Sequence, residues 1–336
     1  MRTVLVTGGA GFIGSNFIHY LLERYDDLRV VNLDKLTYAG NLDNLAGVAA
    51  DPRYEFVAGD IGNRELVDHL MPRVEVVVNF AAESHVDRSI MGAEQFMHAN
   101  ATGVYVLLDA ARRHRVERFL QVSTDEVYGS LQPDEAPWTE ASPLAPRNPY
   151  AVSKAAGDMM ARSFHVTYGL PVLVTRAANN VGPYQYPEKR VPLFITNAID
   201  DLPLPVYGKG TAIRDHLDVT DHCEAIDLVL RSGVPGEVYN VGAENEADGM
   251  ALTERILDAL GKPRSLIQHV TDRPGHDMRY SLDCAKLHRL GWEPRHDLEA
   301  CIARTVAWYR EHQDWWRKIK ESVGFRAYYA RQYGGR

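Results

Sequence analysis

The chain has 336 residues, of which 45% are hydrophobic, 24% charged and 9% aromatic. These proportions are typical of a soluble globular protein with one large domain or two closely packed ones. The formal net charge of −8 argues against general nucleic-acid binding. No apolar run approaches the roughly 18 residues of a membrane-spanning helix, and no signal-peptide pattern precedes the first expected strand.

The cysteines point to a reducing compartment. Cys223, Cys284 and Cys301 are widely spaced and odd in number, and their spacing matches no pair of metal ligands. We therefore expect a cytoplasmic protein with no metal site, no membrane association and no nucleic-acid partner.

A glycine-rich turn near the N-terminus predicts a dinucleotide site. It separates an expected strand over residues 3–7 from an expected helix, and its glycines are Gly8, Gly11 and Gly14. This spacing permits a tight turn and brings a pyrophosphate close to the helix N-terminus. A second strand over 28–33 leads to Asp34, about 20 residues past the glycines, where a carboxylate accepts from a ribose hydroxyl and repels a 2′-phosphate. NAD is therefore favoured over NADP, and a structural glycine turn is the alternative.

Strands and helices then alternate along the chain. Strands are predicted over residues 54–57, 74–80, 118–122 and 171–176, and helices over 93–114 and 150–168. Repeated strand–helix units imply a parallel sheet with right-handed crossovers. We therefore predict a Rossmann-type, doubly wound α/β fold that binds its ligands at the carboxyl ends of the strands.

The alternation fades beyond residue 176, which predicts a smaller mixed C-terminal lobe for the substrate. One more strand, over 238–242, is expected to return to the sheet. The expected NAD-binding domain is 1–180 plus a returning segment near 215–243, and the expected lobe is 181–214, 244–285 and 295–336. Basic residues beside turns in this half favour an anion pocket over isolated surface charges: Lys189, Arg190, Arg214 and Arg273.

The stretch from Ser123 to Lys154 carries the candidate catalytic groups. Tyr150 and Lys154 are expected one turn apart on a helix, where the ammonium group would lower a phenol pKa that is normally about 10. Asp125 and Glu126 follow a strand end, and two adjacent carboxyl groups that differ in protonation can act as an acid and a base. The alternative interpretation is that the Tyr–Lys pair lies on a solvated helix face and the carboxyl pair in an acidic turn. The dinucleotide motif makes this alternative less favoured.

These residues resemble a known family. The chain is similar to the extended short-chain dehydrogenase/reductases, and within them to the dTDP-glucose 4,6-dehydratases, from the first strand to about residue 277. The matching stretches are 7–14, 34–41, 81–89, 123–129, 179–180, 214–215 and 272–277. Asp125-Glu126 is the distinguishing pair, because epimerases of the superfamily carry small residues there and GDP-mannose dehydratases keep only the Glu.

The resemblance implies roles for the catalytic residues. Tyr150, helped by Lys154, takes the proton of the sugar 4-hydroxyl, which Thr124 holds, while the C4 hydride passes to NAD⁺. Glu126 then removes the C5 proton, and protonated Asp125 gives a proton to the departing 6-hydroxyl. Return of the hydride to C6 yields a 4-keto-6-deoxy sugar, so NAD should stay bound throughout.

The resemblance also implies two sets of binding residues. The expected cofactor-binding residues are Gly8, Gly11, Phe12, Ile13, Gly14, Asp34, Lys35, Leu36, Thr37, Asp60, Ile61, Phe80, Ala81, Ala82, Glu83, Ser84, Ala99, Tyr150, Lys154 and Asn180. The expected substrate-binding residues are Ser84, Thr124, Asn179, Lys189, Arg190, Pro205, Val206, Tyr207, Arg214, Asp272, Arg273, His276 and Tyr333. Arginines suit a diphosphate because they bind its oxygens in bidentate fashion.

The chain departs from the family pattern at two positions. Val181 replaces a Tyr of the usual Asn-Asn-Tyr-Gly-Pro motif, and Gly249 stands where the family has an Asn on the nucleotide side. The second departure leaves dTDP-glucose and another nucleotide sugar, such as UDP-glucose, as alternative substrates of a dehydratase or epimerase. A non-catalytic NAD-binding protein is a more distant alternative. As in relatives, a homodimer is expected, with residues 93–114 and 150–168 pairing into a four-helix bundle.

Overall fold

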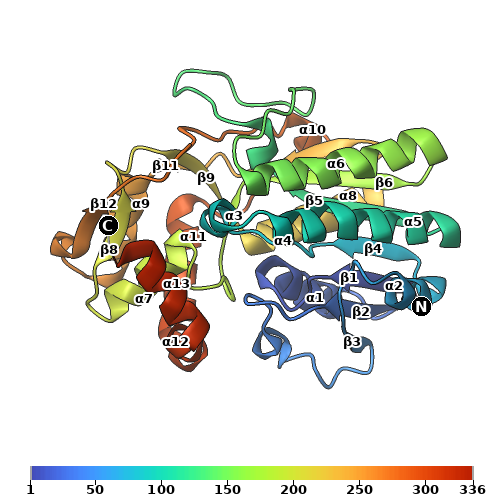
Figure 1. The fold of residues 1–336 in the computed structure, drawn as a ribbon, viewed down its shortest axis with the longest axis horizontal. Helices are drawn as coiled ribbons and strands as arrows, with labels where there is room; N and C mark the ends of the chain where they lie inside the picture. Colours follow the sequence, from blue (N-terminus) through green and yellow to red (C-terminus); the bar gives the residue numbers. More distant parts are fainter. Residues whose placement is uncertain (1, 335–336) are drawn as a thin grey trace.

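The computed structural model describes residues 2–334. Its central sheet has seven parallel strands in the order β10-β6-β5-β4-β1-β2-β3 (Figure 1). The strands are β1 Arg2–Thr7, β2 Leu28–Asp34, β3 Tyr54–Ala58, β4 Val76–Asn79, β5 Arg118–Thr124, β6 Val172–Ala177 and β10 Val238–Val241. The strand order reverses between β1 and β4, so the predicted doubly wound fold is confirmed.

Both faces of this sheet are buried, because its strands are apolar on both sides. Val4 and Val6 of β1 pack toward one face and Leu5 toward the other, as the pleat requires. The first face is covered by α1 Phe12–Arg24 and α8 Val219–Ser232. The second face is covered by α2 Arg64–Leu70, α5 Val104–His114 and α6 Pro149–Tyr168, and the short helix α4 Glu94–Met97 packs against α6. The alternation read from the sequence therefore becomes a three-layer sandwich.

The remaining elements form a smaller lobe beside the carboxyl edge of the sheet, at the left of Figure 1. Its strands are β7 Asn179–Val181, β8 Leu204–Tyr207, β9 Ile213–Asp218, β11 Glu246–Asp248 and β12 Ile267–Val270. Its helices are α7 Arg190–Ile199, α9 Gly249–Leu260, α11 Leu298–Glu311, α12 Gln313–Glu321 and α13 Val323–Tyr333. A separate apolar cluster, with Phe194, Ile302 and Trp316 among its members, forms the core of this lobe.

Two further short helices are α3 Val86–Met91, which follows β4, and α10 Ala285–His288, which contacts β10. Around α10, Leu282, Leu287 and Trp292 pack into the core beneath the central sheet, although the expected lobe extends to residue 285. The domain division read from the sequence stays a prediction. No helix within residues 2–334 combines the length and the apolar character needed to cross a membrane.

The helix expected over 93–114 is interrupted. It consists of α4, a π-helical turn His98–Gly103 and α5. Inside the π-helical turn, the Asn100 side chain donates to the Glu83 carbonyl at 2.9 Å and to Ser153 Oγ at 2.8 Å. The Glu83 amide in turn donates to Asn100 Oδ1 at 2.9 Å. The π turn thus ties the loop after β4 to helix α6, as such turns often do near functional sites.

Candidate active site

The glycine turn lies between β1 and α1, where the strand order reverses. Gly8 has φ of +69°, and a Cβ there would lie 2.6 Å from the Ala81 amide nitrogen. A Cβ on Gly14 would lie 2.4 Å from the Gly8 carbonyl oxygen. Neither position can hold a side chain without moving the backbone. The turn therefore leaves the amides at the start of α1 open to a phosphate.

A pocket opens at this turn, and nearly all of the expected cofactor-binding residues line it. They are Gly8, Gly11, Phe12, Ile13, Gly14, Asp34, Lys35, Thr37, Asp60, Ile61, Phe80, Ala81, Ala82, Glu83, Ser84, Ala99, Tyr150 and Lys154. Leu36 lies outside, and its amide donates to Asp34 Oδ1 at 2.7 Å. Asn180 lines a neighbouring pocket instead, where His222 Nδ1 lies 2.8 Å from its Oδ1.

The polar groups of this cofactor pocket fit a dinucleotide. Asp34 is buried, which raises the pKa of its carboxyl, and its Oδ2 accepts from the Ala10 amide at 2.9 Å. Glu83 Oε2 and Ser123 Oγ are buried without a hydrogen-bond partner among the described residues. Buried polar groups normally find partners. The glycine turn, the carboxylate and these unpaired oxygens together suit a dinucleotide with a free ribose hydroxyl.

Tyr150 and Lys154 lie on the first turns of α6, as expected. Asn148 caps this helix by accepting from the Ala151 amide at 2.9 Å. Lys154 Nζ donates to the Val122 carbonyl at 2.6 Å, and burial lowers the pKa of Lys154 to about 8. The side chains are thus fixed between β5 and α6.

One electrostatic expectation is wrong in this structure. Burial raises the pKa of Tyr150 well above its ordinary value, the Glu126 carboxylate raises it further, and the hydrogen bond with Thr124 opposes them. The sequence predicts instead that Lys154 lowers that pKa. In the structure the Lys154 ammonium group is turned to a backbone carbonyl, and the shift is set by the lost hydration of the phenol and by its acidic neighbours.

The acidic pair follows β5 directly. Thr124 is the last residue of the strand, and its hydroxyl donates to Asp125 Oδ1 at 3.1 Å. Asp125 is 1% exposed, its Oδ2 has no hydrogen-bond partner within residues 2–334, and burial followed by the Glu126 charge raises its pKa well above the usual range. Glu126 reaches the second pocket, where its Oε2 accepts from the Tyr280 hydroxyl at 3.5 Å. The pair thus consists of a buried carboxyl group with a raised pKa behind a second carboxyl group that faces a pocket.

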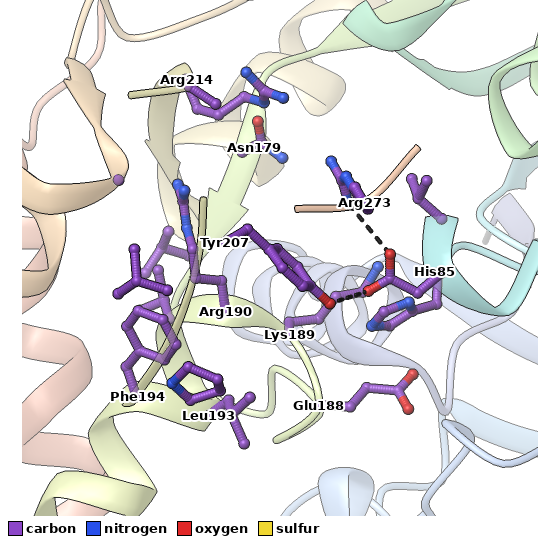
Figure 2. Close-up of a pocket in the computed structure, with 18 of the residues that line it drawn as sticks. His85, Asn179, Glu188, Lys189, Arg190, Leu193, Phe194, Tyr207, Arg214 and Arg273 are labelled. Carbon is purple, nitrogen blue, oxygen red and sulfur yellow. Dashed lines mark hydrogen bonds and ion pairs between the residues drawn. The ribbon is translucent and has the colours of Figure 1, made fainter. Parts of the chain in front are cut away.

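The second pocket lies between the sheet and the smaller lobe and collects most of the expected substrate-binding residues (Figure 2). They are Ser84, Asn179, Lys189, Arg190, Pro205, Val206, Tyr207, Arg214, Arg273, His276 and Tyr333. Thr124 and Asp272 lie outside its lining, and Asp272 Oδ1 lies 2.7 Å from His276 Nδ1. Ser84 and Lys189 line both pockets, so the two pockets adjoin.

Four basic side chains, three of them arginines, line this substrate pocket beside three acidic ones. Within the described chain Arg190 and Arg214 form no ion pair, and Arg214 instead donates to backbone carbonyls, including that of Asp277 at 2.9 Å. Burial, together with the charges of Arg214 and Arg273, lowers the pKa of Arg190 to about 9. Figure 2 shows Tyr207 and Arg273 turned toward one carboxylate, that of Asp87. Buried cations without counter-ions indicate a site for an anion.

Several lining residues had no signal in the sequence. The cofactor pocket also contains Tyr38, Tyr186 and Glu188, and the substrate pocket contains Phe194, His216 and Tyr280. Apart from Tyr38, they lie outside the stretches that carry the resemblance, and only the three-dimensional fold brings them here. Val181 is buried in the apolar core of the smaller lobe, and Gly249 lies in the substrate pocket wall.

The fold and the site define an extended short-chain dehydrogenase/reductase. Residues 5–305 match the family model described as GDP-mannose 4,6 dehydratase, and the chain belongs to this family.

Within the family the chain is similar to named sugar-modifying proteins. A dTDP-glucose 4,6-dehydratase of an Actinoplanes species is 52% identical over 321 residues, covering 93% of this chain and 99% of that relative. The low-salt glycan biosynthesis protein Agl12 of Haloferax volcanii is 54% identical over 303 residues, covering 89% and 97%. The dTDP-glucose 4,6-dehydratase DesIV of Streptomyces venezuelae, solved with NAD and dTDP bound, has a TM-score of 0.92 and 50% identity, covering 95% and 100%.

Proposed function

We propose that this protein uses NAD to convert dTDP-glucose into dTDP-4-keto-6-deoxyglucose. One observation carries the proposal: the buried Asp125 carboxyl, whose pKa is raised by burial, lies directly beside Glu126, which faces the pocket next to the cofactor pocket. The dTDP-glucose 4,6-dehydratases to which the chain is about 50% identical support it. An epimerase has no need for an acid–base pair of this kind.

In this proposal NAD, when bound, accepts the C4 hydride and later supplies it to C6. Tyr150 takes the proton of the 4-hydroxyl, which the Thr124 hydroxyl positions. Because burial raises the pKa of Tyr150, the phenol must become more acidic when ligands bind. Lys154, one turn along the same helix face, supplies positive charge for this change.

The elimination step then falls to the acidic pair. Oxidation at C4 makes the C5 proton acidic, and Glu126 removes it from inside the substrate pocket. Asp125 gives its proton to the departing 6-hydroxyl, which leaves as water. When the hydride returns to C6, Glu126 gives the proton back to C5, which completes the 4-keto-6-deoxy sugar. Burial keeps Asp125 protonated for this role, while its neighbour is only partly buried.

The substrate pocket is assigned to the nucleotide diphosphate. Arg190, Arg214 and Arg273 would hold the two phosphates, since guanidinium groups bind such oxygens in pairs. Tyr207 and Tyr333 stack with their rings 6.2 Å apart and would flank the base. The two domains predicted from the sequence would then each bind one ligand, the cofactor or the nucleotide sugar.

We also propose a cytoplasmic homodimer. Helices α5 and α6 lie side by side in Figure 1 and expose large apolar side chains. Among them are Tyr105, Val152, Met159 and Val166, the last two 59% and 84% exposed. Pairing with a second copy would bury them in a four-helix bundle. Sedimentation at micromolar protein should show a dimer, and Met159→Glu should weaken it; a wild-type monomer contradicts this proposal.

A product assay tests the proposed reaction. The purified protein is incubated with dTDP-glucose or UDP-glucose without added NAD, and the 4-keto-6-deoxy product is followed by its absorbance in base. We expect turnover of dTDP-glucose, supported by cofactor that co-purifies. Turnover of UDP-glucose alone would show that the substrate carries uridine diphosphate. Tight binding of either nucleotide sugar without product would favour the non-catalytic alternative.

Glu126→Gln tests the elimination step. The variant should still oxidise C4, which is seen as NADH formed in one turnover. It should release no 4-keto-6-deoxy product, because the C5 proton has no acceptor. Product formation at the wild-type rate would refute the assignment of Glu126.

A further inference from the structure

Arg88 joins four separate segments of the chain. Its guanidinium group lies between two aromatic rings, 3.9 Å from the centroid of Tyr38 and 4.3 Å from that of Tyr328. Its Nε and one terminal nitrogen donate to Glu188 Oε2 at 3.0 and 2.8 Å. The Glu188 side chain is only 1% exposed, so the ion pair is shielded from water. We refer to Arg88, Tyr38, Tyr328 and Glu188 as the Arg88 clasp.

The clasp forms part of the wall of the cofactor pocket. Tyr38 and Glu188 line that pocket together with the glycine turn, and the Tyr38 ring meets the edge of Tyr186, another lining residue, at 5.4 Å. Tyr38 comes from the loop after β2, whereas Glu188 precedes α7 and Tyr328 lies on α13. The wall is therefore built from both lobes, and Arg88 holds them together.

The same short helix serves both pockets. Asp87, next to Arg88 on α3, accepts from the Tyr207 hydroxyl at 3.0 Å and lies 3.6 Å from Arg273. These are substrate-pocket residues. Helix α3 is thus anchored to the smaller lobe at two adjacent residues, through the contacts of Asp87 and through those of Arg88.

We propose that Arg88 is a positioning residue that retains NAD between turnovers. In the proposed reaction the hydride taken from C4 must return to C6 of the same sugar, so the cofactor should not exchange. A dinucleotide in this pocket can leave when the wall between the lobes opens. Opening that wall breaks the two cation–π contacts and the shielded ion pair. The inference deepens the proposed function and depends on it only through the cofactor.

Tyr328 offers the cleanest test, since it lines neither ligand pocket. Holoprotein is loaded with radiolabelled NAD, and exchange against excess unlabelled NAD is measured without sugar. We expect Tyr328→Leu to speed NAD release about tenfold, because the variant loses one of the two cation–π contacts of Arg88. Tyr328→Phe keeps the ring and should release NAD at the wild-type rate. Because no sugar is present, a wrong substrate assignment leaves this result unaffected.

Arg88 variants and a remote control complete the test. Arg88→Lys keeps a charge for Glu188 but loses the planar stacking group, so its release should also be faster than wild type. Arg64, whose guanidinium group lies 5.1 Å from the centroid of the Tyr105 ring, lines neither ligand pocket and is the matched control, so Arg64→Ala should leave NAD release unchanged. Wild-type release rates in folded Tyr328→Leu and Arg88→Lys would overturn the proposal. If Arg64→Ala released NAD as fast as these variants, the proposal would also be overturned. The faster release would then come from a general loss of stability and not from the clasp.

Discussion

Asp125→Asn probes the protonated acid directly. Asp125 is 1% exposed, and burial raises its pKa well above the ordinary value of 3.8. Between the unfolded and folded pKa values, the folded protein holds one proton that the unfolded chain has lost. The free energy of unfolding should therefore fall as pH rises through this window, by about 1.4 kcal/mol per pH unit at most. Below pH 4 this destabilising contribution disappears, because both states are protonated.

Asn cannot ionise, so the variant should lack this slope. Urea unfolding of wild type and Asp125→Asn between pH 4 and 8 gives the difference in free energy at each pH. We expect the free energy of unfolding of the variant, relative to that of the wild type, to increase steadily as pH rises to the folded pKa of Asp125. Thr124 can still donate to the amide oxygen, so the local hydrogen bond survives. Product formation should nevertheless fall by about 10²–10⁴, the usual contribution of a general acid.

The exposed Asp134 provides the control for this measurement. Asp134→Asn makes the same side-chain replacement at a solvated site and should leave the curve parallel to that of the wild type. If Asp125→Asn also runs parallel, Asp125 is an ordinary ionised carboxylate in the folded protein. It could not then donate a proton at neutral pH, and the assignment of the acid would be refuted.

Three further substitutions test the pockets. Gly14→Ala places a Cβ 2.4 Å from a backbone oxygen, so the amount of NAD that co-purifies and the Tm should both fall. Gly324 has open space around it, so the control Gly324→Ala should change neither quantity. Arg214→Ala should raise KM for the nucleotide sugar about 10- to 100-fold in steady-state assays, with kcat changed less, since hydrogen bonds to charged groups contribute about 1.5–3 kcal/mol. Gly249→Asn should raise KM for dTDP-glucose and UDP-glucose alike, because its Cβ would crowd Arg190 Nη1 at 3.3 Å; selective gain for dTDP-glucose would contradict this.

The sequence predicts the parts of the site that depend on local structure. A glycine turn after a strand and a Tyr–Lys pair on one helix face are set by residues near one another in the chain. The doubly wound sheet follows in the same way from the repeated strand–helix units. These parts of the site required only the order and spacing of the residues.

The remaining features depend on burial and on distant contacts. Tyr150 has a raised pKa because β5 and α6 enclose it, and no local pattern reports that loss of hydration. The clasp joins Tyr38 to Tyr328, almost the full length of the chain apart. Asn100 owes its role to a π turn that the apolar spacing of the helix does not reveal. Each of these features requires contacts between elements that are distant in the sequence, and the clasp alone among them joins both lobes.

In the proposed reaction, the adjacency of the two carboxyl groups explains how elimination can proceed in order. After burial, the charge of Glu126 is the main cause that holds the proton on Asp125. When Glu126 takes the C5 proton, that charge disappears, and the pKa of Asp125 falls. Asp125 then becomes the stronger acid at the stage when the 6-hydroxyl needs a proton. The acid therefore stays protonated until the base has acted, which couples the two proton transfers without any movement of the backbone.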